Sequence, residues 1–186
     1  MQNPFDPSLA NPPLRDALEE ISNRYDPKDV AKQIPDVKHL RRRHDHAIRL
    51  IEAVAEASAG PGQYNCYMYA LNVHRSPAVT DLLARRNIAF GNDFMAWLIE
   101  SGRLTPISAD AAAAGDIVLY SDRSGPKHAG RWDGKAVQSK WGLGHLWSHR
   151  VFEVRSSYGD AAQAYQRVDS AAMAQWFVEY ADGSAD

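Results

Sequence analysis

Residues 115–139, GDIVLYSDRSGPKHAGRWDGKAVQS, decide the fold class of this chain. Residues 116–121 contain a short continuous apolar run, which is typical of a buried strand. Residues 128–132 and 135–139 flank the dipeptide Asp133-Gly134. Asp-Gly between two such runs is a strong hairpin signal, because a two-residue type I′ turn needs positive φ at both central positions. The stretch therefore predicts adjacent antiparallel strands.

Helical patterns dominate the chain before this stretch. Apolar residues at helical spacing, capping residues and chain breakers predict helices at residues 14–23, 37–59, from 66 onward, 79–86 and 92–101. After the stretch, residues 152–154 and 164–168 predict two more strands. Asp169 is placed to cap a last helix. Helices first and strands afterwards indicate an α+β fold, with N-terminal helices packed on an antiparallel sheet.

The length and composition indicate an ordinary globular protein. The chain has 186 residues, enough for one compact domain with a helical extension. Gly60-Pro61-Gly62 interrupts the helical part, so we expect an N-terminal helical extension over 1–60 and a main domain over 61–186. The single cysteine excludes an intrachain disulfide framework and a multi-cysteine zinc site. We expect no cofactor.

The charge pattern limits the class of partner. Twenty-one basic and twenty-three acidic residues give a net charge of −2, so we expect neither nucleic acid nor a membrane as partner. Arg41, Arg42 and Arg43 lie in a basic cluster, which is either a solvated helix face or a contact surface for an acidic protein partner. No signal-peptide core is visible near the N-terminus. We expect a cytoplasmic location, or export without a signal peptide.

Cys66 is the first candidate for chemistry. Asn65 is placed to cap a helix that begins at Cys66, and unpaired N–H groups at a helix start stabilise a thiolate. A cysteine buried in a core helix is the alternative. A catalytic thiol also needs a base within hydrogen-bond reach, and His128 at the start of a predicted strand is the candidate.

These motifs together resemble a known family. Asn65-Cys66 at a helix start, then GDIVLY at 115–120 and KHAG at 127–130, is similar to the NlpC-type papain-like cysteine peptidases and amidases. Residues 140–149 and 157–159 are similar to an uncharacterised bacterial branch of such proteins. The resemblance implies that Cys66 is the nucleophile and His128 the general base. It also implies a third polar residue opposite His128 on the neighbouring strand.

Two residues are candidates for that third position. A two-residue turn at Asp133-Gly134 places Ser139 opposite His128. A three-residue turn slips the register and brings Gln138 near His128 instead. Ser139 is the better geometric match, and Gln138 is the better chemical match because its amide oxygen can hold an imidazole N–H.

The expected function is thiol-dependent hydrolysis of a peptide or isopeptide amide, with cell-wall peptides as the family's commonest substrate. Tyr64 and Trp141 are candidates for substrate contacts, with aromatic core packing as the alternative. The unusual cysteine flanks, with Asn65 in place of the family's Asp, favour a second hypothesis: a non-catalytic papain-like module that binds a protein or peptide. A metal site of Cys66, His145 and His149 is a further alternative.

Overall fold

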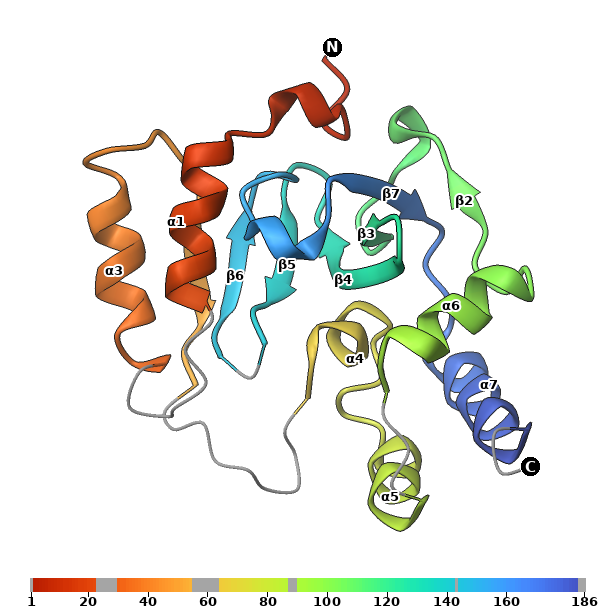
Figure 1. The fold of residues 1–186 in the computed structure, drawn as a ribbon. Helices are drawn as coiled ribbons and strands as arrows, with labels where there is room; N and C mark the ends of the chain where they lie inside the picture. The colour runs from red at the N-terminus through yellow and green to blue at the C-terminus, as the bar shows by residue number, and fades with distance from the viewer. Residues whose placement is uncertain (1, 23–29, 55–63, 87–89, 143, 184–186) are drawn as a thin grey trace.

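The chain folds around one antiparallel sheet (Figure 1). The computed structural model describes residues 2–22, 30–54, 64–86, 90–142 and 144–183. Seven strands run in the order β1-β6-β5-β4-β3-β7-β2, and each neighbouring pair is antiparallel. The strands are β1 (Arg49–Glu52), β2 (Pro106–Ile107), β3 (Ile117–Asp122), β4 (Gly125–Trp132), β5 (Val137–Lys140), β6 (Leu146–His149) and β7 (Ala161–Tyr165).

Six α-helices surround the sheet in the described part of the chain, which confirms the predicted α+β class. They are α1 (Pro12–Ser22), α3 (Gln33–Leu40), α4 (Cys66–Ala70), α5 (Pro77–Arg86), α6 (Asn92–Glu100) and α7 (Ser170–Gly183). Short 3₁₀ turns add η1 (Pro7–Leu9), η2 (Ala109–Ala111) and η3 (Ser156–Tyr158). In Figure 1, α1 and α3 stand on one side of the sheet, and α4 to α7 lie on the other side of the molecule.

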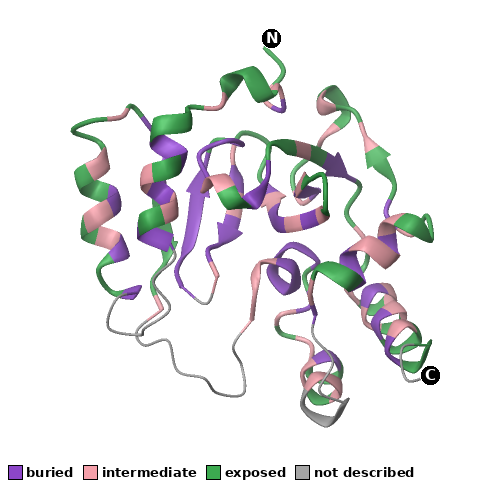
Figure 2. Cartoon of the chain, viewed as in Figure 1, coloured by how far each residue is buried: buried purple, intermediate pink, exposed green. Residues whose placement is uncertain are grey.

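Two hydrophobic cores follow from the alternation of side chains along the strands. Val118 and Tyr120 of β3 join Leu14 and Leu18 of α1 in one cluster, here called the α1-side core. Ile117 and Leu119 point the other way. They join a second cluster, the α4-side core, whose other members include Met68, Phe94 and Phe177. Successive strand residues face opposite sides of a sheet, so the continuous apolar run at 117–120 is buried on both faces. Figure 2 shows the resulting burial in the central strands.

The hairpin between β4 and β5 forms with a different register from either one expected. Asp133 pairs with Ala136, because its N–H donates to the Ala136 carbonyl at 2.9 Å, so the turn residues are Gly134 and Lys135. The Asp133 carboxylate holds this turn by accepting from the amides of Lys135 and Ala136 at 2.9 and 2.7 Å. Gly134 supplies the positive φ of 98°. The ladder therefore pairs Arg131 with Gln138 and Trp132 with Val137.

The segment predicted as one helix over 37–59 is divided in the structure. Helix α3 ends at Leu40, residues 41–44 form a turn, and residues 49–52 become edge strand β1. The prediction was wrong here because pairing with β6 overrides helical periodicity in a short segment. Strand β1 also joins the N-terminal part to the main sheet. The expected boundary at Gly60 and Pro61 lies outside the described residues.

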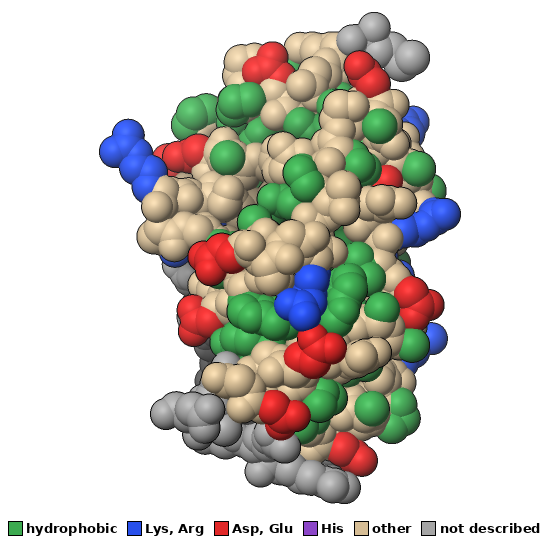
Figure 3. Space-filling view, turned by 90° about the vertical axis from the view of Figure 1, so that its right-hand side faces the viewer, with side chains coloured by type: hydrophobic (Ala, Val, Ile, Leu, Met, Phe, Trp, Pro, Cys, Tyr) green, Lys and Arg blue, Asp and Glu red, His purple; other side chains and the backbone are tan. Residues whose placement is uncertain are grey.

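The segment after β6 also differs from the sequence prediction. Residues 152–154 form a turn rather than a strand, with Phe152 and Val154 buried in the α1-side core. The last predicted strand is present but begins earlier, at Ala161. No helix within the described ranges has both the length and the apolar character needed to cross a bilayer. Figure 3 views the side that carries α7 and β2, where acidic side chains are scattered among hydrophobic ones.

Candidate functional site

Cys66 opens helix α4, as the sequence predicted. Asn65 is its N-cap residue, and its side-chain oxygen accepts from the amide of Met68 at 3.0 Å. The Asn65 amide group donates in turn to the Phe90 carbonyl at 2.6 Å, which ties the helix start to the segment before α6. Cys66 is half-buried and packs at the margin of the α4-side core. A capped and anchored helix start therefore fixes the backbone beneath the thiol.

The electrostatic setting of Cys66 differs from the one expected. Burial raises the pKa of the thiol to about 11, although the backbone amides of Ala129, Tyr67 and Cys66 itself face the sulfur and act in the opposite direction. Helix α4 has only five residues, so its dipole is small and the individual N–H groups carry the effect. The loss of hydration raises the pKa of the thiol more than these amides lower it, so Cys66 is a neutral thiol at rest.

His128 lies on β4, immediately before Ala129, whose amide faces the Cys66 sulfur. Its ring stacks on Tyr158, with 3.7 Å between ring centroids and 9° between the planes. The ring of Tyr120, its partner across the β3–β4 ladder, lies 5.5 Å away. Neither ring nitrogen has a hydrogen-bond partner among the described residues. The imidazole is fully buried, and burial lowers its pKa well below the usual value.

Cys66 and His128 are thus neighbours through the backbone of β4 rather than through their side chains. The thiol packs with the α4-side core, whereas the ring partners of His128, Tyr120 and Tyr158, belong to the α1-side core. No thiol–imidazole hydrogen bond joins these two described residues. The structure therefore places both residues next to the β4 backbone but directs their side chains to opposite faces of the sheet, and both are neutral at rest.

Ser139 bonds a different histidine from the one expected. Its hydroxyl lies 2.7 Å from Nε2 of His149, and Nδ1 of His149 lies 2.8 Å from the Arg150 carbonyl. A carbonyl can only accept, so Nδ1 carries the proton and Nε2 accepts from Ser139. Both side chains are fully buried. Burial lowers the pKa of His149 to about 4, so this pair is a neutral link between β5 and β6.

Gln138 points to the opposite face of the sheet from Ser139. Its side-chain oxygen accepts from the Tyr69 hydroxyl at 2.9 Å, and its amide nitrogen lies 3.4 Å from a carboxylate oxygen of Asp133. Arg131, its partner across the ladder, lies over the Tyr69 ring at 4.7 Å. Neither Ser139 nor Gln138 contacts His128, because the turn at Gly134 and Lys135 gives the hairpin a register that differs from both of the expected ones.

The two expected substrate-contact residues have different environments. Tyr64 is half-buried, and its ring contacts His74 at 4.8 Å and carries the Lys140 ammonium at 4.3 Å. Trp141 is 2% exposed and stacks on Trp147 in the α1-side core. Tyr64 therefore lies near the surface beside Cys66, whereas Trp141 is a core residue. Its burial leaves no surface for a substrate, so that expectation was wrong.

The structure also shows the environments of the proposed metal ligands and of the basic cluster. His145 accepts from the Val54 amide and bonds the Val30 carbonyl, so both of its ring nitrogens are used. With His149 held by Ser139, the Cys66–His145–His149 metal alternative is not assembled, and no group of three metal-ligating side chains occurs within the described residues. Arg41, Arg42 and Arg43 are exposed in the turn after α3, not on a helix face.

Sequence reasoning missed Arg15, which supports the loop that carries Tyr158. Arg15 is 4% exposed, and its guanidinium donates to the carbonyls of Val154, Arg155, Ser156 and Gly159 and pairs with Asp160 at 3.0 Å. In the sequence, Arg15 is one charged residue on an amphipathic helix. Only the fold shows that it binds a loop about 140 residues away in the chain.

Comparisons of this chain with family models, with curated proteins and with solved structures found no match.

Proposed function

We propose that this protein is a thiol-dependent hydrolase of the papain-like, NlpC type, with Cys66 as its nucleophile. The supporting observation is the position of Cys66 at the Asn65-capped start of α4, which packs on the strand that carries His128, so that backbone amides of α4 and β4 favour negative charge on the sulfur. Such donors stabilise negative charge, whether on a thiolate or on the oxyanion of a tetrahedral intermediate. The substrate class is a peptide or isopeptide amide.

The reaction begins from a neutral pair. With the pKa of the Cys66 thiol raised and that of His128 lowered, no thiolate–imidazolium pair is formed in advance. The Cys66 proton passes to His128 as the sulfur attacks the amide carbonyl, and His128 then gives that proton to the leaving amine. Water hydrolyses the resulting thioester. This sequence requires the imidazole to leave its stack on Tyr158 and to move from the α1-side core to the side of β4 where Cys66 lies, because in the resting structure the two side chains belong to opposite faces of the sheet.

The test is amide hydrolysis measured as release of free amine from a panel of peptide and isopeptide substrates. Cys66→Ala removes the nucleophile and should abolish turnover, and His128→Gln should lower it by at least about a hundredfold, the contribution expected of a general base. Arg123→Ser changes an exposed residue in the β3–β4 turn and serves as the matched control. Turnover that survives Cys66→Ala contradicts the proposal.

A second candidate, a non-catalytic papain-like module that binds a peptide or protein, is favoured by one specific observation. The two candidates to orient His128 form hydrogen bonds with other residues. Ser139 bonds His149, and Gln138 bonds Tyr69. If no amide in the panel is cleaved, while a peptide binds with the same affinity to the wild type and to Cys66→Ala, the binding module replaces the hydrolase.

A further inference from the structure

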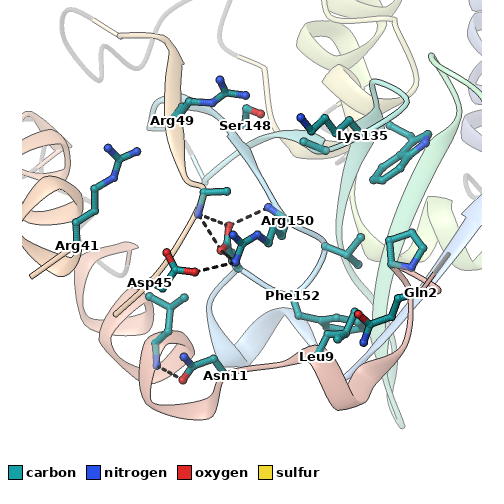
Figure 4. Close-up of a pocket in the computed structure, with 17 residues that line it drawn as sticks. Gln2, Leu9, Asn11, Arg41, Asp45, Arg49, Lys135, Ser148, Arg150 and Phe152 are labelled. Atoms are coloured by element: carbon teal, nitrogen blue, oxygen red, sulfur yellow. Dashed lines mark hydrogen bonds and ion pairs between the residues drawn. The ribbon is translucent and has the colours of Figure 1, made fainter. Parts of the chain in front are cut away.

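A groove of about 950 Å³ crosses the surface beside the N-terminal segment (Figure 4). Its floor is apolar and includes Leu14, Trp132, Val151 and Phe152, all nearly buried in the α1-side core. Leu9 adds an apolar side chain at the margin that remains 42% exposed. Neither Cys66 nor His128 lines this groove. It is therefore a site separate from the proposed thiol chemistry.

Four basic side chains border the groove, namely Arg41, Arg49, Lys135 and Arg150. Figure 4 shows that they come from separate segments of the chain, with Arg150 in the middle and Leu9 and Phe152 to one side of it. Because these segments are fixed by the turn after α3, by β1, by the β4–β5 turn and by the end of β6, their charges are held together by the fold. The sequence indicates only the basic cluster at Arg41, because Arg49, Lys135 and Arg150 are distant from one another in the chain and the net charge is −2.

The two acidic residues that line the groove are already occupied. Glu153 accepts from the amides of Ala47 and Arg150, each at 2.9 Å, and its other partner is the Arg150 guanidinium at 3.4 Å. Asp45 also pairs with Arg150 at 3.4 Å. These contacts neutralise Arg150. Within the described residues Arg49 and Lys135 have no ion-pair partner, and Arg41 donates only to the Ile48 carbonyl. The lining as a whole, with four basic and two acidic residues, is therefore net positive, and among the described residues Arg41, Arg49 and Lys135 have no carboxylate partner.

A second hollow of about 300 Å³ adjoins the first, because Arg41 and Arg49 line both. It lies between α3 and β1, with Ile34, Val37 and Leu50 among its apolar lining residues. Lys38 adds a further positive charge, and no acidic residue lines this hollow. Strand β1 itself is exposed along its length, with Ile51 at 45% exposure. The basic and apolar surface thus extends along the edge of the sheet.

We propose that this basic groove binds an acidic peptide segment of a partner protein. Carboxylates of the segment pair with Arg41, Arg49 and Lys135, and an apolar side chain lies against Leu9, the exposed hydrophobic residue at the margin of the groove. Charge complementarity selects the partner and speeds its association. Nucleic acid fits the lining less well, because bases bind by stacking on open aromatic rings, and Trp132 and Phe152 are only 7% and 3% exposed.

The test measures the affinity of a fluorescein-labelled peptide of alternating glutamate and leucine by fluorescence anisotropy. The double variant Arg49→Ser with Lys135→Ser changes two exposed residues and should lower affinity by about tenfold, the effect of losing two exposed ion pairs. Added salt should weaken binding to the wild type. Arg123→Ser is the matched control, an exposed arginine away from the groove, and should bind as the wild type does.

Three results would overturn the proposal. The first is equal binding of a peptide with lysine in place of glutamate. The second is unchanged affinity in the double variant. The third is a labelled single-stranded oligonucleotide that binds more tightly than the acidic peptide and loses binding in the double variant, which would make the groove a nucleic-acid surface. Cys66→Ala should leave peptide affinity unchanged, so failure of the hydrolase proposal does not affect this one.

Discussion

The imidazole of His128 lies flat on the phenol ring of Tyr158, with 3.7 Å between their centroids and 9° between their planes. This stack connects the candidate base on β4 with η3, a turn that Arg15 holds through several backbone carbonyls. It keeps both ring nitrogens of His128 out of hydrogen bonds, at a place where they are fully buried. The stack therefore matters both for stability and for any chemistry of Cys66.

Replacing Tyr158 tests what the stack contributes. Tyr158→Leu removes the ring and should lower the free energy of unfolding by about 2 to 4 kcal/mol, the usual range for losing a buried ring and its packing. Tyr158→Phe keeps the ring and should cost much less. Urea denaturation of both variants measures the difference. If both variants lose the same free energy of unfolding, the hydroxyl of Tyr158 rather than its stacked ring stabilises this region.

Arg15 should be sensitive even to a conservative change. Arg15→Lys keeps the charge but loses the planar fork that reaches several carbonyls at once, and Arg15→Met also loses the charge. We expect both to lower the free energy of unfolding, by about 3 kcal/mol for methionine, because buried carbonyls lose their donors. Thermal unfolding gives the comparison. If Arg15→Lys is as stable as the wild type, a positive charge alone is enough to hold this loop.

Stability should fall with acid through the buried histidines. Burial lowers the pKa of His128 and of His149, the latter to about 4, whereas the unfolded chain protonates near the usual pKa of about 6.5. Below 6.5 the unfolded state binds more protons, so the stabilisation present above that pH is lost as the pH falls toward 4. For His149 alone the loss is about 3 kcal/mol.

Denaturation curves between pH 7 and pH 4 measure this loss. His149→Gln removes the ionisable ring and should flatten the dependence of stability on pH, whatever its cost at pH 7. The exposed residue His39 provides the matched control, since His39→Gln changes a histidine outside the core. A pH dependence that is the same in the wild type and in His149→Gln would contradict the assignment.

Gly130 should not tolerate a side chain, because β5 passes directly over it. A Cβ at this position would lie 2.5 Å from Val137 Cγ1 and 2.7 Å from the Gln138 carbonyl oxygen. Gly130→Ala should therefore cost about 1 to 3 kcal/mol by forcing β4 and β5 apart. Gly183→Ala, with nothing near its added Cβ, is the control. Equal stability of the two variants in urea denaturation would contradict the close approach.

The reactivity of Cys66 should depend steeply on pH. Only the thiolate reacts with iodoacetamide, and the pKa of this thiol is about 11. The alkylation rate should rise by about tenfold for each pH unit up to about pH 10, because the thiolate fraction rises in that proportion below the pKa. Mass spectrometry follows the reaction at the single cysteine. Rapid alkylation at neutral pH would mean that the folded protein activates the thiol after all.

The sequence alone determined the fold class and the position of Cys66. A continuous apolar run at 117–120, helical periodicity around Leu14 and Leu18, and an asparagine before Cys66 each act within a few residues, so local chemistry identifies them. The position of His128 on a strand was equally local. These features needed no knowledge of distant contacts.

The contacts of each side chain were decided only by the tertiary structure. Asp133 binds the amides of Lys135 and Ala136, which moves the hairpin turn by one residue and directs Ser139 to His149 and Gln138 to Tyr69. Strand β1 forms only because β6 is beside it, so helical periodicity misled there. The basic groove likewise depends on contacts between segments that are distant in the sequence. Coulomb interactions depend on distance in space, and Arg49 and Lys135 come together only when the sheet is complete.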